Sequence, residues 1–345
     1  GDVQRLKRIG SKVVIVYFLM TVIACIVGIV MVNITHPGVG FTLDNMQAFD
    51  TSKVKTPSFV NFLFDMVPVN IVDSMAKNQI MQMIFFTVLV GVALVSLGEK
   101  VAGVTKIFDQ CASIIYKMLD IVMLYSPIGV LALMANTTAV FGPKLFGVLA
   151  KFVFTDWVGC LLIWFFFSGI VWLYTKVNYL EMCKSMIPIW VNTIATNSSA
   201  GTIPITLNVT TERLKVPMSI ASFSIPLGAT INLTGAALYK TILAFFVAEI
   251  YGLQLTIDQI LMVIIISTIM SIAAPGIPGG GIVTGAIFLN LLGLPMDLMG
   301  PIAGMYRLID MSHTTVNVSG DVLGTMLVAK NENIWTGEDF NKTLV

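Results

Sequence analysis

The sequence contains few charged residues for its length. Of its 345 residues, 11% are Asp, Glu, Lys or Arg, while 56% are hydrophobic and the mean hydropathy is +0.89. A soluble domain carries roughly 25% charged residues, so the composition predicts an integral membrane protein. The formal net charge of +1 provides no basic surface for nucleic acid, and we expect no nucleic-acid partner.

Cysteine motifs and the common hydrolase motifs are also absent. The four cysteines (Cys25, Cys111, Cys160 and Cys183) are scattered, and no CxxC pair or Cys/His cluster occurs. A metal site or disulfide framework is therefore weakly supported, and we expect buried thiols that act as small hydrophobic side chains. No GxSxG or HExxH motif appears, and the sequence predicts that the protein is not an enzyme.

Long apolar runs are what the sequence does contain. Four of them reach the length of about 20 residues that a membrane span requires. Pro127 and Gly129 are expected to kink the third run. The four runs cover residues 13–33, 78–98, 121–142 and 152–175.

Two further segments are apolar at both ends but polar or rich in Gly and Pro at the centre. Residues 185–211 and 264–293 have this pattern, and a helix interrupted at "GATINLTG" lies between them, over 219–250. Irregular backbone inside a membrane is tolerated only where protein or a watery cavity surrounds it. We therefore predict an all-α integral membrane protein, a multi-span bundle with two re-entrant helical hairpins and broken helices. Repeated broken helices are typical of a secondary transporter's substrate site, although Gly and Pro are common in membrane helices generally.

The tips of the two predicted hairpins differ in chemistry. The first, "TNSSAGTIP", offers amide N–H groups and the hydroxyls of Ser198, Ser199 and Thr202, which suit a carboxylate. A tight turn whose hydroxyls bond local carbonyls is the simpler alternative. The second tip, "SIAAPGIPGGG", has few functional side chains and is expected to act as a flexible lid.

The last predicted helix, over residues 301–330, carries a polar stripe. Asp310, His313, Thr314, Asn317 and Asp321 share one helical face, with offsets of 3, 4, 7 and 11 residues from the first. Its two carboxylates lie about 16 Å apart along the axis, which is too far to share a ligand or to act as an acid–base pair. One division assigns the first to a substrate ammonium and the last to a cation, together with Asn232 and carbonyls freed by the helix break.

These segments resemble one known family. "SSAGTIP", "PLGATINLTGAALY", "GIPGGG" and "DMSHTTVNVSGDVLGT" are similar to motifs of the glutamate transporter homologues, the dicarboxylate/amino acid:cation symporter family. The similarity runs from about residue 5 to about residue 330, and the family's first two helices have no counterpart in it. It implies a secondary active symporter in a prokaryotic inner membrane, with an amino acid and the lipid bilayer as partners.

The resemblance also implies a homotrimer with an elevator-like mechanism. Residues 45–142 would form the scaffold and oligomerisation helices. The transport domain would combine the first visible helix, in residues 1–44, with residues 143–345, which contain both hairpins, the broken helix and the final helix.

Site residues follow by matching motif positions. The resemblance implies substrate contacts by a set drawn from both hairpin tips and the final helix: Ser198, Ser199, Gly276, Ile277, Asp310, His313, Thr314 and Asn317. One sodium site would use Gly228, Asn232, Asn317 and Asp321. A second would use backbone oxygens around Thr230, Ser271 and Ile272.

Two departures from the family pattern concern charge. His313 stands where members with acidic substrates carry an Arg, and Thr234 stands where a third sodium site has an Asp. We therefore expect a neutral or otherwise non-acidic amino acid as substrate, and sodium coupling with fewer ions. Histidine changes charge near neutral pH, so His313 has three open roles: proton coupling, hydrogen bonding to the substrate side chain, or packing.

Two alternative functions stay open. The first is a symporter of an acidic amino acid or dicarboxylate, with protons as a coupling ion through His313. The second, of another class, is an anion channel, although no ring-forming filter motif is visible.

Overall fold

The computed structural model describes residues 3–41, 63–77, 79–272, 274 and 276–342. The regular elements among these residues are helices, and no strand occurs among them. The chain forms two compact units. One comprises Gly1–Lys55 with Phe141–Val345, and the other is Thr56–Val140. Helical stretches long and apolar enough to cross a membrane, by length and composition, cover Arg8–Thr35, Met81–Ile115, Lys144–Thr175 and Met218–Ile250.

The smaller unit is built from short and medium helices. They are α3 (Ile71–Ala76), α4 (Ile80–Leu97), the 3₁₀ turn η2 (Gly98–Val101), α5 (Ala102–Met123) and most of α6 (Ser126–Phe141). The predicted span over 121–142 was wrong at its start, because its first residues belong to α5. Pro127 opens α6 and does not kink it, since the first turn of a helix needs no N–H donor from that residue.

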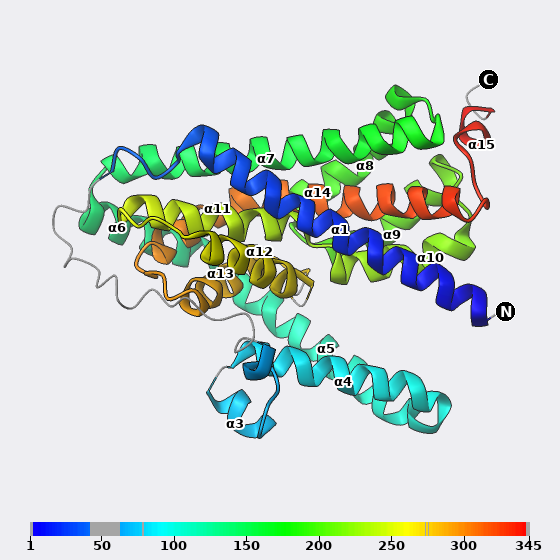
Figure 1. Ribbon diagram of the computed structural model, residues 1–345, viewed down its shortest axis with the longest axis horizontal. Coiled ribbons are helices and arrows are strands. Elements are labelled where there is room, and N and C mark those ends of the chain that lie inside the picture. Colours follow the sequence, from blue (N-terminus) through cyan, green and yellow to red (C-terminus); the bar gives the residue numbers. More distant parts are fainter. Residues whose placement is uncertain (1–2, 42–62, 78, 273, 275, 343–345) are drawn as a thin grey trace. The chain divides into compact units, whose positions relative to one another are not determined.

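The larger unit surrounds one buried helix, α11 (Thr234–Ile250). Helices α1 (Val3–Thr35), α7 (Lys144–Thr175) and α12 (Ile257–Ile272) pack against it, as does α14 (Met299–Asn331). Figure 1 shows α14 running beside α7 along the length of this unit. The final predicted helix is thus one continuous element, which keeps the polar stripe on one face.

Two helix pairs lie where hairpins were predicted. In the first, α8 (Tyr179–Thr196) leads into α9 (Ser199–Asn208) and a π turn, η3 (Val209–Arg213). Asn197 ends α8 in the left-handed region at φ 51°, and the Ser198 hydroxyl caps α9 by accepting from the Gly201 N–H at 3.0 Å. In the second pair, α12 is followed by α13 (Gly280–Leu291).

The helix between the pairs is broken as expected. Helix α10 (Met218–Ile231) ends at Asn232, and α11 starts two residues later, so that Asn232 and Leu233 are not helical. The last helix among the described residues is α15 (Gly337–Asn341). The expectation of buried thiols holds for Cys25 and Cys160, whereas Cys111 is exposed and Cys183 is half-buried.

An ion-pair cluster ties the start of α1 to the end of α14. The Glu332 carboxylate accepts from Lys12 Nζ, and from Arg8 Nη2 at 2.6 Å. The hydrogen bonds from Lys12 and then Arg8 lower the pKa of Glu332 below its usual value. Figure 1 places the start of α1 and the short helix α15 (Gly337–Asn341) at the same end of this unit.

This cluster predicts a pH-dependent contribution to stability. A lowered carboxyl pKa contributes stability above the unfolded value of about 4.3, and that contribution is lost as pH falls through the folded value. We expect Glu332→Gln to lower the free energy of unfolding by about 1 kcal/mol at pH 7 and by less at about pH 3, below the unfolded pKa. Thermal unfolding of the purified protein at both pH values measures this. Glu338→Gln, at an exposed position of α15, is the control, and an equal effect at both pH values would contradict the prediction.

Candidate functional site

A small cavity of about 20 Å³ lies between the two helix pairs, the break before α11 and the middle of α14. Of the predicted substrate residues, all except Ser198 line it: Ser199, Gly276, Ile277, Asp310, His313, Thr314 and Asn317. Asn197, Ala236 and Tyr306 also contribute to its wall. Residues spread over more than a hundred positions of the chain therefore converge on one place.

The tips of the two helix pairs touch each other at Gly276. Its carbonyl oxygen accepts from the Ala200 N–H and from the Ser198 hydroxyl, each at 3.4 Å. A Cβ atom at Gly276 would lie only 2.7 Å from the carbonyl oxygen of Ala229, so the close approach of the second tip to the end of α10 requires glycine. In this arrangement the tips close over the cavity.

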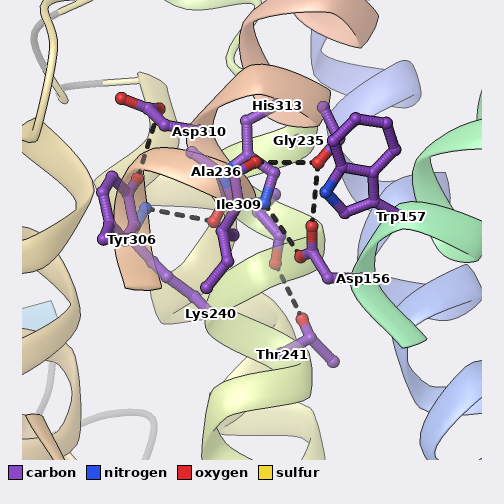
Figure 2. Close-up of polar contacts among 12 residues, drawn as sticks. Asp156, Trp157, Gly235, Ala236, Lys240, Thr241, Tyr306, Ile309, Asp310 and His313 are labelled. Atoms are coloured by element: carbon purple, nitrogen blue, oxygen red, sulfur yellow. Dashed lines mark hydrogen bonds and ion pairs between the residues drawn. The ribbon is translucent and has the colours of Figure 1, made fainter. Parts of the chain in front are cut away.

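Asp310 supplies the negative charge of the cavity. One carboxylate oxygen accepts from the Gly279 N–H at 3.1 Å, and the other from the Tyr306 hydroxyl at 3.5 Å. Figure 2 shows the carboxylate of Asp310 beside the Tyr306 hydroxyl. Only 8% of Asp310 is exposed. A buried carboxylate seeks a cationic partner, and a substrate ammonium entering this cavity would supply one.

Three polar atoms of cavity-lining residues are buried without a hydrogen-bond partner among the described residues. They are the Ser199 hydroxyl, the side-chain oxygen of Asn197 and Nδ1 of His313. Buried polar groups are almost always paired in folded proteins. Unpaired ones in a cavity are therefore candidates for hydrogen bonds to a ligand.

The second ring nitrogen of His313 is held by a residue that the sequence analysis missed. Nε2 of His313 lies 2.8 Å from a carboxylate oxygen of Asp156 on α7, and the Ser312 hydroxyl donates to the other oxygen at 3.1 Å. Both partners are almost fully buried, and Figure 2 shows Asp156 pointing from α7 toward the imidazole. An acidic residue within an apolar span is a functional signal by itself, and Asp156 could have been found that way.

The same pair belongs to the metal-ligating group found among the described residues. The ligand atoms of Asp156, Cys160 and His313 all lie within 4.8 Å of one another. The Asp156–His313 contact has hydrogen-bond geometry, so these two residues form a hydrogen-bonded pair with the Cys160 thiol beside it.

The residues of the first predicted sodium site come together next to the cavity, which Asn317 also lines. Asn232 donates to the Asp321 carboxylate at 2.9 Å and to the Asn317 carbonyl oxygen at 3.3 Å, and the Asn317 side chain accepts from the Gly235 N–H at 2.7 Å. A Cβ atom at Gly228 would lie only 2.4 Å from the Asp321 carboxylate. Hard oxygen ligands in a buried carboxylate site suit a small cation.

The second predicted sodium set is arranged differently. Thr230 is exposed, and its hydroxyl donates to the Leu227 carbonyl at 2.7 Å. Ser271 is buried and accepts from the Lys240 ammonium at 3.1 Å, whereas Ile272 is half-buried at the end of α12. Thr234, which stands where the family's third sodium site has an Asp, donates to the Asn232 side chain at 3.1 Å.

Comparison with known proteins gives a consistent picture. The model of the sodium:dicarboxylate symporter family matches residues 1–331. A proton/glutamate-aspartate symporter of Bacillus subtilis is 30% identical over 345 residues, covering 99% of this chain and 83% of that protein. One from Escherichia coli is 32% identical, covering 96% and 78%. A C4-dicarboxylate transport protein of B. subtilis is 30% identical, covering 96% and 80%.

Proposed function

Because the chain belongs to the sodium:dicarboxylate symporter family and is a cation-coupled symporter of the inner membrane, we propose that its substrate is a dicarboxylic acid, most simply aspartate or glutamate. The expectation of a neutral amino acid is not supported, because the relatives are named for glutamate, aspartate and C4-dicarboxylates. That expectation rested on the missing Arg at position 313.

The observation that carries this proposal is the Asp156–His313 pair. The carboxylate of Asp156 lies 2.8 Å from Nε2 and can accept from it, while Nδ1 is unpaired at the cavity wall. Both ring nitrogens of a protonated imidazole donate, so Nδ1 could then donate to a substrate carboxylate while Nε2 bonds Asp156. A protonated His313 supplies the positive charge that a second substrate carboxylate needs. A substrate with two carboxylates and a proton would therefore bind together.

Other residues of the cavity would bind the remaining groups of the substrate. Asp310 would hold the α-ammonium, and the Ser199 hydroxyl would donate to the α-carboxylate near the start of α9. The cluster of Gly228, Asn232, Asn317 and Asp321 would hold one sodium ion. Protons and sodium are thus both assigned as coupling ions.

We extend the proposal to the conformational cycle. The two helix pairs would be re-entrant hairpins, and substrate entry would break the hydrogen bonds of Ala200 and Ser198 to Gly276. The division of the chain into two compact units supports an elevator-like displacement of the larger unit. The smaller unit, whose helix α4 exposes Val88, Val92 and Val95, would form the scaffold of a homotrimer.

Exchange across a membrane tests the proposed function. Purified protein in liposomes loaded with unlabelled aspartate should accumulate external labelled aspartate, in a saturable manner and only with sodium present. Succinate, malate and neutral amino acids are the competitors. A current that never saturates would instead indicate a channel, and competition by neutral amino acids alone would refute a dicarboxylic substrate.

The paired imidazole predicts the pH dependence of binding. The groups facing His313 are Asp156 and Cys160 from α7, Tyr239 from α11, and Tyr306 and Asp310 from α14. Binding of a substrate carboxylate to a protonated His313 should weaken as pH rises from 5.5 to 8, because histidine loses its charge in this range. We expect His313→Gln to weaken aspartate binding about tenfold or more at pH 5.5 and to flatten its pH dependence.

Asp156→Asn should weaken aspartate binding more at pH 5.5 than at pH 8 while it leaves Nδ1 in place, because a protonated imidazole loses the charge-assisted hydrogen bond from Nε2 to this carboxylate. Calorimetric titration of aspartate across the pH range measures both effects. Asp258→Asn, at an exposed position in the first turn of α12, is the matched control. An unchanged pH profile in both His313→Gln and Asp156→Asn would remove His313 from proton coupling.

A further inference from the structure

Lys240 is an unusual residue for its position. It lies in the middle of α11 and is 0% exposed, and it is the one lysine or arginine among the buried described residues. The acidic residues buried in the same unit are Asp156, Asp310 and Asp321. A buried ammonium is costly unless other groups compensate its charge, so its contacts indicate what it does.

The ammonium is held by oxygen atoms and not by a carboxylate. Lys240 Nζ donates to the Ser271 hydroxyl at 3.1 Å and to the Ala236 carbonyl oxygen at 3.3 Å, and it forms no ion pair with the acidic residues described above. Figure 2 shows the side chain folding back along α11 to the Ala236 carbonyl. Neutral oxygens of this kind are the ligands that an alkali or alkaline-earth cation uses in proteins.

The ammonium also lies at the end of a helix dipole. Ser271 belongs to the last turn of α12, which ends at Ile272. The last carbonyl groups of a helix lack intrahelical partners and carry a partial negative charge. A positive charge is therefore favoured there, whether it is a free ion or an ammonium.

We propose that the Lys240 ammonium is a tethered cation that occupies a metal-ion position at the end of α12. It would replace one coupling sodium ion with a charge that belongs to the protein. The inference rests on the proposed sodium-coupled function. The position meant is defined by the Ser271 hydroxyl and the Ala236 carbonyl oxygen, whereas the second predicted sodium set used backbone oxygens around Ser271.

Electrostatics explains why the two cations exclude each other. A sodium ion bound to Ser271 would lie within a few ångströms of the ammonium, and like charges at such distances repel strongly in a buried site. The Ser271 oxygen is also already committed as an acceptor. Removing the ammonium while leaving Ser271 in place should therefore open this position to sodium.

The test compares Lys240→Met with the unmodified protein. Met keeps the length and flexibility of the side chain but has no charge. We expect sodium chloride, relative to choline chloride, to raise the unfolding temperature of Lys240→Met more steeply than that of the unmodified protein. In aspartate titrations, the slope of log apparent Kd against log sodium concentration reports the number of coupled sodium ions. Its magnitude should increase by about one in Lys240→Met, because one more sodium ion binds with the substrate.

Companion variants identify the position. Lys240→Met with Ser271→Ala should lose the extra sodium dependence, because the hydroxyl ligand is gone. Lys240→Met with Ser267→Ala, one turn earlier on α12 and buried without a partner among the described residues, should retain it. Lys240→Gln provides a second neutral side chain if the Met variant does not fold.

The outcomes separate this inference from the proposed function. Sodium responses of both neutral variants identical to the unmodified protein would overturn the tethered cation, even with aspartate transport intact. An extra sodium response that survives Ser271→Ala would overturn its location. The sodium-alone unfolding measurement needs no substrate, so it decides the inference even if aspartate is not the substrate.

Discussion

Replacing Asp310 with Asn is expected to weaken the binding of aspartate or glutamate by about 100-fold or more. The ammonium of the bound amino acid would be buried in the cavity without a carboxylate, and an uncompensated buried charge costs about 3–5 kcal/mol. Asn has the same shape as Asp and can still accept from the Gly279 N–H, which bonds Asp310 at 3.1 Å. The closed arrangement of the second tip should therefore persist.

The same variant distinguishes the two substrate classes named for the relatives. Succinate has two carboxylates and no ammonium, so Asp310→Asn should leave its binding unchanged or improve it by removing a nearby negative charge. Calorimetric titration of aspartate and succinate measures both, with Asp258→Asn as the exposed control. Unaltered aspartate affinity in Asp310→Asn would mean that this carboxylate does not hold the ammonium.

Replacing Asp321 with Asn is expected to abolish most of the sodium dependence of substrate binding. Asp321 is fully buried, and its carboxylate is held by Asn232 at 2.9 Å, with Gly228 packed directly against it. Loss of the one anionic ligand of a buried cation should raise the sodium concentration needed for half-maximal binding by about 100-fold. The neutral amide can keep the hydrogen bond to Asn232, so the protein should fold.

The measurement is aspartate affinity at a series of sodium concentrations, with choline maintaining ionic strength. In Asp321→Asn, the affinity for aspartate should be weak at every sodium concentration and should hardly change as sodium is raised. The Asp258→Asn control should follow the unmodified protein. A variant that binds aspartate tightly, with the original sodium dependence, would place the coupling ion elsewhere.

Local sequence patterns predicted the helical framework well. Helical periodicity put Asp310, His313, Asn317 and Asp321 on one face, and α14 is continuous across them because nothing in that stretch breaks a helix. The break before α11 was visible in "GATINLTG", where it occurs at Asn232 and Leu233. The boundary between α5 and α6 was not visible in the sequence, because a Pro in an apolar run is compatible with both a kink and a helix start.

The substrate was predicted less well, for a physical reason. When the sequence was compared with the family motif position by position, His313 was interpreted as a position that had lost the positive charge of an arginine. The structure pairs Nε2 of His313 with Asp156 on another helix, and this contact leaves Nδ1 unpaired at the cavity wall. A side chain's chemistry depends on its neighbours in space, which a motif on one helix does not contain.

The sequence by itself determined that the protein is an all-helical membrane protein of this family, where its chain breaks inside apolar segments, and which polar residues share a helical face. The family was identified from the resemblance of its motifs, and the other features follow from composition and periodicity, which are local properties. Only the tertiary structure joined Asp156 to His313, 157 residues away, and Lys240 to Ser271, 31 residues away. Those pairs depend on how α7, α11, α12 and α14 pack, and packing decides which buried charges meet.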